Sequence, residues 1–322
     1  LPMETRRPPQ IGFLGFGEAA FEISRGLVAQ GLTDIRAFDK MQHVNIVGQR
    51  AKESGVVLAA DVKELAQRSQ LIISAVTSAA ALDAARSIAP CLTAEHIYVD
   101  INTASALTKR DVYEVIRQAG SKFVDAAVMA AVPGNGHQVP MLICGDGADQ
   151  FRGLMTPYGM NLTLIDGDVG SASTVKTLRS VFMKGIAVLS IESLSAACKA
   201  GVYDYVLDSL KTTFEGRSFE ELINRWICGT AIHASRRKHE MGEVLTTLNA
   251  LGANSIMTEA TRDALGWIEA ENLWEHFGGK VPRNHMDVLE LIACSDLVRG
   301  DEKTSTDCED VTESGQKQQG GD

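Results

Sequence analysis

The sequence predicts an α/β protein in which a doubly wound parallel sheet is followed by an all-helical domain. Short apolar runs alternate with helical patterns from residue 11 to about residue 165, and this alternation favours a parallel sheet covered by helices. A glycine-rich turn joins the first apolar run to the first helix. After residue 170 the strand pattern stops, and only helical periodicity remains.

The strands of the sheet domain are predicted from short runs of β-branched and aromatic residues that end in turns. They span 11–14, 35–38, 56–58, 71–76, 97–99, 122–125, 140–144 and 162–165. Periodic apolar residues between them predict helices up to residue 30, over 41–54, after an N-cap at Asp61, over 79–89 and over 108–119. Together these elements define a first domain over residues 11–168.

The second domain, residues 169–299, is predicted to be entirely helical. From 171 to 200 there is no proline and apolar side chains recur every three or four residues, which predicts one long buried helix. Further helices are predicted over 219–239, with a break near Gly229, and over 242–251, 255–270 and 285–296. Because this domain is small and presents long apolar faces, we expect a homodimer with interlocked helical domains.

Composition and charge exclude several classes of protein. The 322 residues are 45% hydrophobic and 22% charged, as in ordinary soluble proteins, and the net charge is −10. Nucleic acids and anionic membranes bind basic surfaces, so neither is expected as a partner. Half of the net charge lies in residues 300–322, an acidic segment with almost nothing to bury. It is predicted to be disordered, as are residues 1–10.

Cysteine and histidine spacing predicts neither disulfides nor a metal site. The six cysteines form no C-x-x-C pair, and the seven histidines show no grouping typical of zinc. Residues 1–10 lack the apolar segment of a signal peptide, and the most apolar long window, 181–198, contains Lys184 and Glu192. We therefore expect a reducing, cytoplasmic location and no membrane span.

The turn after the first strand is typical of a dinucleotide-binding site. In Gly15-Phe16-Gly17-Glu18-Ala19-Ala20, the first glycine permits a tight turn and the second lets the backbone approach a pyrophosphate. The N-terminus of the following helix offers free N–H groups to the phosphates. The turn therefore predicts a Rossmann-like domain whose cofactor-binding residues include Gly15, Phe16, Gly17, Glu18 and Ala19.

Asp39 ends the second strand, where an acid can hold the ribose hydroxyls of NAD and repel the 2′-phosphate of NADP. Lys40 can pair with that phosphate, so NAD is favoured and NADP stays possible. Ligands of parallel sheets bind at the carboxyl ends of the strands, so residues after the later strands are expected in the same site. These residues are Val76, Thr77, Asn102 and Thr103.

Three further segments complete a family pattern: Asp100-Ile-Asn102-Thr103, the run from Asp125 to Gly134, and the helix that carries Lys176. With the glycine turn, in this order over about residues 10–200, the chain resembles the β-hydroxyacid dehydrogenases, which include 3-hydroxyisobutyrate and 6-phosphogluconate dehydrogenases. The resemblance implies an NAD(P)-dependent enzyme that interconverts a hydroxyl and a carbonyl group. It also implies that Lys176 handles the proton and that residues 128–131 cradle a substrate carboxylate.

Two departures from that family pattern concern the substrate. Met129, Ala130 and Ala131 replace the usual S-G-G, so only backbone N–H groups are left for a carboxylate, and Ser180 replaces the usual Asn. The family's usual substrate, a small 3-hydroxy acid, is therefore not carried over. Segments 178–186 and 233–241 resemble a subgroup with a divergent C-terminal domain, which indicates a reaction class and no particular substrate.

Elementary chemistry supports Lys176 as the general acid and base. Removing a hydride from an alcohol requires a base for the hydroxyl proton, and burial beside a cation such as Arg179 lowers the pKa of a lysine toward neutrality. Ser180 lies one turn later on the same helix face and can hydrogen-bond the substrate. Arg179 and Arg236 are candidate ligands of a small carboxylated or otherwise anionic substrate.

Two other functions stay open on sequence grounds. One is an imine reductase on the same scaffold, since those enzymes resemble this architecture. They generally lack the lysine, so the presence of Lys176 counts against this alternative. The other is a cofactor-binding protein without turnover, in which the altered carboxylate cradle has lost its substrate. The alternative to an anion site around Arg236 is a solvated charged face. The alternative to substrate contact by His137 is an exposed position in a loop.

Overall fold

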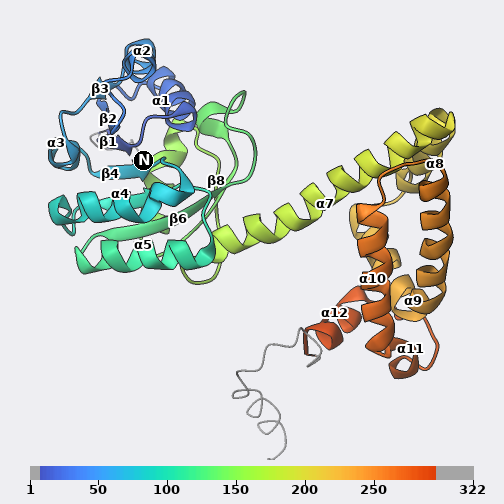
Figure 1. Ribbon diagram of the computed structural model, residues 1–322. Helices are drawn as coiled ribbons and strands as arrows, with labels where there is room; N and C mark the ends of the chain where they lie inside the picture. The colour runs from blue at the N-terminus through green and yellow to red at the C-terminus, as the bar shows by residue number, and fades with distance from the viewer. Residues whose placement is uncertain (1–7, 295–322) are drawn as a thin grey trace, which may run out of the picture. The chain divides into compact units, whose positions relative to one another are not determined.

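The computed structural model describes residues 8–294, and the predictions for residues 1–7 and 295–322, including the acidic tail, lie outside this range. The predicted fold class is confirmed, because an eight-stranded sheet with helices is followed by helices alone (Figure 1). The chain divides into two compact units between Gly185 and Ile186. This division lies inside a helix that begins at Ser171, and not after residue 168, because the first turn of that helix is bonded to the sheet.

The eight strands follow one another in the order β3-β2-β1-β4-β5-β6-β7-β8. They are β1 (Ile11–Leu14), β2 (Ile35–Phe38), β3 (Val57–Leu58), β4 (Leu71–Ser74), β5 (Ile97–Asp100), β6 (Lys122–Val128), β7 (Met141–Cys144) and β8 (Leu162–Leu164). All neighbours are parallel except β6 and β7. The parallel arrangement predicted from the sequence ends there, since the connection between these two strands holds no α-helix that could cross over the sheet.

Helices cover both faces of this sheet (Figure 1). Residues of α1 (Glu18–Ala29), α2 (Asn45–Ser54) and α6 (Ala148–Met155) join the core on one face. Residues of α3 (Val62–Gln67), α4 (Ala81–Ile88) and α5 (Ala106–Gln118) join the core on the other. Phe13 of β1 faces the first core and Leu14 the second. Burial on both faces explains why the central strands β1 and β4 are nearly continuous apolar runs.

The helical unit is built around α9 (Phe219–Ala250), against which α10 (Ile256–Ala270), α11 (Leu273–His276) and α12 (His285–Cys294) pack. Before them come α7 (Ser171–Ala200) and α8 (Tyr203–Phe214). The buried Glu192 of α7 caps α10, because its carboxylate accepts the N–H groups of Met257 and Thr258 and the Thr258 hydroxyl. Burial alone would raise the pKa of Glu192, but these hydrogen bonds outweigh it and lower the pKa.

Two details of the helical unit differ from the prediction. The helices expected over 219–239 and 242–251 run together as α9, and the break predicted near Gly229 is a kink one turn later, at His233 (φ −113°, ψ 19°). Gly229 instead makes room for a neighbour, since a Cβ there would lie 3.0 Å from Arg237 Nη2. In addition, α8 forms over a segment for which the sequence predicts no helix.

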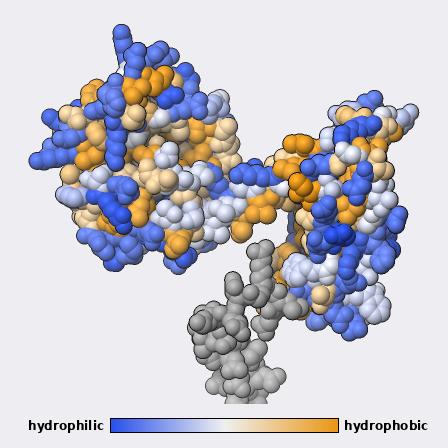
Figure 2. Space-filling view, viewed as in Figure 1, coloured by the Kyte–Doolittle hydropathy of each residue, from blue (hydrophilic) through white to orange (hydrophobic). Residues whose placement is uncertain are grey.

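Helix α7 is exposed where the sequence predicts burial. Only 17% of its most apolar 18-residue window is buried, and Leu178, Val181 and Ile191 are 65%, 71% and 68% exposed. Apolar side chains are visible along this helix and on the helical unit in Figure 2. By length and composition alone α7 is apolar enough to cross a membrane. The same helix, however, carries the buried Glu192 that caps α10, which is an interaction of a protein core.

Candidate active site

Two adjoining cavities lie at the carboxyl ends of the parallel strands, where ligands bind in such sheets. The larger, of about 470 Å³, is lined by the glycine turn and the ends of β2 and β4, including Gly15, Gly17, Glu18, Ala19, Asp39, Lys40, Val76 and Thr77. The smaller, of about 260 Å³, is lined by residues that include Ala19, Val76, Asn102, Thr103, Ala130 and Lys176. The structure therefore brings most of the predicted site residues together.

The two glycines of the turn have different functions. Gly15 has a φ of +90°, and a Cβ there would lie 2.6 Å from Val76 Cγ1 and 2.7 Å from the Ala75 carbonyl oxygen. Around Gly17, by contrast, no residue of 8–294 other than its two chain neighbours lies within 4 Å of the position of a Cβ. Helix α1 begins after Gly17 without a side-chain cap. Among residues 8–294, no side chain occupies this space or caps the first N–H groups of the helix, which fits a bound pyrophosphate.

Asp39 is held in place by the backbone around the cavity. Its Oδ2 accepts the Phe16 N–H at 2.7 Å, and its Oδ1 accepts the Met41 N–H at 2.7 Å. A carboxylate has further lone pairs beyond these two, so Asp39 can still accept ribose hydroxyls. The Phe16 side chain is fully buried in the core. Phe16 therefore positions Asp39 rather than contacting a cofactor with its ring, a role that the sequence does not predict.

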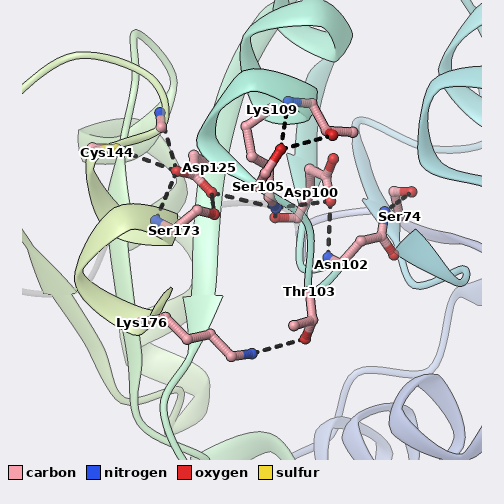
Figure 3. A network of polar contacts seen from close by, with 12 residues as sticks. Ser74, Asp100, Asn102, Thr103, Ser105, Lys109, Asp125, Cys144, Ser173 and Lys176 are labelled. Atoms are coloured by element: carbon pink, nitrogen blue, oxygen red, sulfur yellow. Dashed lines mark hydrogen bonds and ion pairs between the residues drawn. The ribbon is translucent and has the colours of Figure 1, made fainter. Parts of the chain in front are cut away.

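Asn102 also positions its neighbours. It is buried, its Oδ1 accepts the Val76 N–H at 2.7 Å, and its Nδ2 donates to Ser74 Oγ at 3.0 Å. These bonds tie together the ends of β4 and β5 and use the polar atoms of the amide. Thr103, the next residue, is exposed, and its hydroxyl oxygen is bonded to Lys176 (Figure 3).

Lys176 is an ionisable group that lines the smaller cavity. It lies in the second turn of α7, is partly buried, and its Nζ donates to Thr103 Oγ1 at 2.9 Å. Burial lowers the pKa of Lys176, and the charge of Lys109 lowers it further, while Asp125 acts in the opposite direction. A lysine with a lowered pKa beside a hydroxyl group in a cavity is suited to take up and release a proton.

Ser180 and Arg179, the other predicted residues of this helix, lie outside the lining of both cavities. The Ser180 hydroxyl donates to the Lys176 carbonyl oxygen at 2.9 Å, a bond within the helix that still leaves its oxygen able to accept. Arg179 is exposed. The geometry of the sheet unit therefore does not support a catalytic role for Ser180 or substrate binding by Arg179.

The predicted carboxylate cradle is only partly available. The Met129 N–H donates to the Pro140 carbonyl oxygen at 2.8 Å, and the Met129 side chain packs near Cys144. The Met129 N–H is therefore already engaged, because the pairing of β6 with the segment before β7 continues one residue beyond β6. Ala130 lines the smaller cavity. Among residues 8–294, nothing accepts a hydrogen bond from the N–H groups of Ala130 and Ala131, which leaves both for an anion.

Arg236 belongs to the helical unit, in which it pairs with Glu240. Together with His233, His239 and Trp274, it lines a cavity of about 510 Å³ within that unit. The lining also includes the acidic Glu269 and several apolar groups, and a bound anion there is a proposal taken up below.

The sequence does not reveal a buried charge network behind Lys176. Lys109, Asp100 and Asp125 have no exposed side-chain surface and form ion pairs, and Asp125 is bonded in turn to Ser173 of α7 (Figure 3). One signal was present in the sequence, since Lys109 shares a helical face with the buried Val112 and Ile116.

His137 is buried against α1 and not exposed in a loop. It is 8% exposed, and its ring lies so close to Gly26 and Gly159 that a Cβ would come within 2.1 Å and 3.1 Å of its nitrogens. Burial lowers the pKa of His137, and its Nε2 has no hydrogen-bond partner within residues 8–294. The neutral ring thus holds the loop after β6 against α1.

The stability of the sheet unit should fall as the pH drops below about 6.5, the ordinary histidine pKa. The unfolded chain then binds a proton that the folded protein, with its lowered His137 pKa, does not bind. Urea unfolding at pH 8 and pH 5 measures the loss. In His137→Gln the dependence should shrink, whereas the exposed His43→Gln should keep it; equal dependence in both variants would contradict this role.

Comparison with known proteins gives two family-model matches. Residues 10–156 match the NAD binding domain of 6-phosphogluconate dehydrogenase, and residues 197–268 match a domain of unknown function, DUF1932. An uncharacterised 28.5 kDa protein of Methanothermus fervidus is 32% identical over 267 residues, which are 81% of this chain and 99% of that protein.

Solved structures extend these similarities. A conserved protein of unknown function, described as structurally similar to 3-hydroxyacid dehydrogenases, is 30% identical with a TM-score of 0.56 over 81% of this chain and 96% of its own. An imine reductase variant from Myxococcus stipitatus in complex with NAD⁺ is 15% identical, with a TM-score of 0.69 over 88% of this chain and 99% of its own. Another structure of that reductase holds NADP⁺. At such low identity the reductase likeness shows the fold alone.

Proposed function

We propose that this chain interconverts a hydroxyl and a carbonyl group on a small anionic substrate. It belongs to the family of dehydrogenase-like proteins that join an NAD binding domain of the 6-phosphogluconate dehydrogenase type to a DUF1932 domain. The observation that carries the proposal is the Lys176–Thr103 hydrogen bond in a cavity that adjoins the glycine turn. Lys176 provides an acid and base at the carboxyl ends of the strands, beside the larger cavity that is proposed to hold the dinucleotide.

When bound, the nicotinamide donates or accepts the hydride. Lys176, as the neutral amine, removes the proton of the substrate hydroxyl, and as the ammonium it returns a proton to the carbonyl oxygen in the other direction. Its lowered pKa makes the neutral amine more accessible than in an ordinary lysine. The Thr103 hydroxyl orients Nζ, and the N–H groups of Ala130 and Ala131 hold the anionic group of the substrate.

NAD is the proposed cofactor rather than NADP. Gly15, Gly17, Glu18, Ala19, Lys40, Val76 and Thr77 line the groove that would hold it. Asp39, fixed by two backbone N–H groups, presents a negative charge where a 2′-phosphate would lie. Repulsion between two anions in a partly buried groove costs affinity, so Asp39 discriminates against NADP.

A homodimer in the cytoplasm is proposed as the working form. Exposed apolar side chains of the helical unit support it, among them Ile191, Tyr205 and Ile256 at 68%, 81% and 67% exposure (Figure 2). Exposed apolar side chains on several helices are typical of a surface that a partner covers. Light scattering that reports twice the 34.6 kDa chain mass supports the dimer. Arg236 is proposed as a ligand of an anion bound in the cavity of the helical unit that it lines.

The function is tested with purified full-length protein, either cofactor, and a panel of hydroxy acids, sugar acids and cyclic imines. Absorbance of the reduced cofactor measures turnover, and calorimetry measures binding. We expect turnover of a hydroxy or sugar acid and at least about tenfold tighter binding of NAD than of NADP, a difference of about 1.4 kcal/mol. Turnover of imines alone would indicate an imine reductase. Tight NAD binding without any turnover would indicate a binding protein.

A further inference from the structure

A lysine ammonium lies buried between two strands of the sheet unit. Lys109, in the first turns of α5, has no exposed surface, and neither do Asp100 at the end of β5 and Asp125 in β6. Its Nζ donates to the Asp100 carbonyl oxygen at 2.7 Å and to Asp100 Oδ1 at 2.9 Å, and it lies 3.3 Å from Asp125 Oδ1. These three acceptors match the three N–H donors of an ammonium group.

Stability alone is a poor reason for such a cluster. Taking charges out of water is costly, and replacing a buried ion pair by apolar side chains is often neutral or stabilising. One carboxylate oxygen, Asp100 Oδ2, has no partner among the residues described, so the cluster is not even fully satisfied. Stabilising the fold therefore does not by itself account for this cluster, and a second role is expected.

Asp125 connects this cluster to α7. Its Oδ2 accepts the N–H groups of Gly170 and Ser173 at 3.2 and 3.1 Å, and its Oδ1 accepts the Ser173 hydroxyl at 2.8 Å (Figure 3). A negative charge is stabilised at the N-terminus of a helix, so Asp125 fixes the position of the first turn. Lys176 lies three residues after Ser173, which places it on the same side of the helix, one turn further on.

We propose that Lys109 is a positioning residue of the proposed active site: paired with Asp125, it locks the first turn of α7 to the sheet and so holds Lys176 against Thr103. The inference rests on the proposed function, in which Lys176 transfers the proton. Lys109 lines neither of the two cavities. It therefore acts through Asp125 and α7 and not on the substrate.

The same pair sets the charge around Lys176. Burial lowers the pKa of Lys176 most, and the Lys109 ammonium on α5 lowers it further. The Asp125 carboxylate on β6 raises it, and Lys184, on α7 itself, lowers it. Lys109 and Asp125 thus act on Lys176 with opposite signs, which a purely mechanical support would not do.

Two neighbours of the pair complete the set of titratable groups. Burial raises the pKa of Asp100, against the effect of the Lys109 charge. Burial also raises the pKa of the Cys144 thiol on β7, which contacts the Asp125 carboxylate. A thiol with a raised pKa stays neutral near pH 7, so Cys144 adds no charge beside Lys176.

The test measures the pKa of Lys176 directly in the full-length protein without substrate. Reductive methylation with ¹³C-formaldehyde labels accessible lysines, and the NMR signal of Lys176 is identified by its loss in Lys176→Arg. We expect Lys109→Met to raise this pKa and Asp125→Asn to lower it. Lys122→Met is the matched control, because Lys122 is an exposed lysine of β6, and it should leave the pKa unchanged.

A second readout follows the first turn of α7. Amide hydrogen exchange at Ser173 should accelerate at least about tenfold in both Lys109→Met and Asp125→Asn and stay unchanged in Lys122→Met. If Lys109→Met does not fold, Lys109→Met combined with Asp100→Asn removes a charge of each sign and takes its place. Unchanged exchange at Ser173 in both variants, or a Lys176 pKa that neither variant moves, would overturn the proposal.

These measurements separate the inference from the proposed function. Opposite shifts and faster exchange in a protein that turns over none of the panel substrates would support the positioning role and remove the enzymatic one. Turnover that depends on Lys176, together with a Lys176 pKa that neither variant moves, would support the enzyme and remove the positioning role.

Discussion

Lys176→Met should lower the maximal rate of the proposed reaction by about 10²- to 10⁴-fold, the usual contribution of a general acid or base. Methionine keeps the apolar stem and removes the group that bonds Thr103 in the smaller cavity. Lys176 does not line the larger cavity, so the Kd for NAD should change less than about threefold. Steady-state kinetics and calorimetry on the same preparations measure the two quantities.

The pH profile distinguishes this role from a loss of structure. Burial and the charge of Lys109 lower the pKa of Lys176, so alcohol oxidation should lose rate as the pH falls through that pKa, where the base becomes protonated. Lys176→Met should lose this limb, and the exposed Lys63→Met should keep both rate and limb. A Lys176→Met enzyme with the rate and pH profile of the wild type would remove Lys176 from the mechanism.

The parts of the fold that the sequence predicts well are those set by local pattern. The strands β1 to β5 and the turn at Gly15 follow from apolar runs, turn residues and one required positive φ. The reversal at β7 and the irregular residue His233 follow instead from how elements pack, which no local pattern encodes. Exposure of α7 is of the same kind, because apolar periodicity indicates a face to be covered but not what covers it.

The site divides in a similar way. Gly17, Asp39 and Lys176 were predictable, since each stands at a motif position with its own chemical reason. Lys109 and Asp125 were not, because a lysine in a helix or an aspartate near a strand end usually indicates solvent. Their pairing is created only when β6 and α5 come together, so it is a property of the tertiary structure.

Gly17→Ala should weaken NAD binding by about 10- to 100-fold, which corresponds to the loss of about one charge-assisted hydrogen bond to a phosphate. The described part of the chain has room for the methyl group, since apart from the two neighbouring residues nothing in it lies within 4 Å and the φ of −77° suits alanine. The free energy of unfolding without ligand should therefore stay within about 0.5 kcal/mol of the wild type. Calorimetry and urea unfolding give the two values.

Gly15→Ala is the matched variant, because the same methyl group there meets Val76 and the Ala75 carbonyl oxygen in a backbone with positive φ. It should cost about 2–4 kcal/mol of stability from strain and overpacking, and lose binding as a consequence. The described residues fill the space beside Gly15 and leave the space beside Gly17 free. A loss of NAD binding in Gly17→Ala without a loss of stability therefore indicates a ligand in that space. If Gly17→Ala binds NAD as tightly as the wild type, the pyrophosphate does not lie at the N-terminus of α1, and the larger cavity is not the cofactor site.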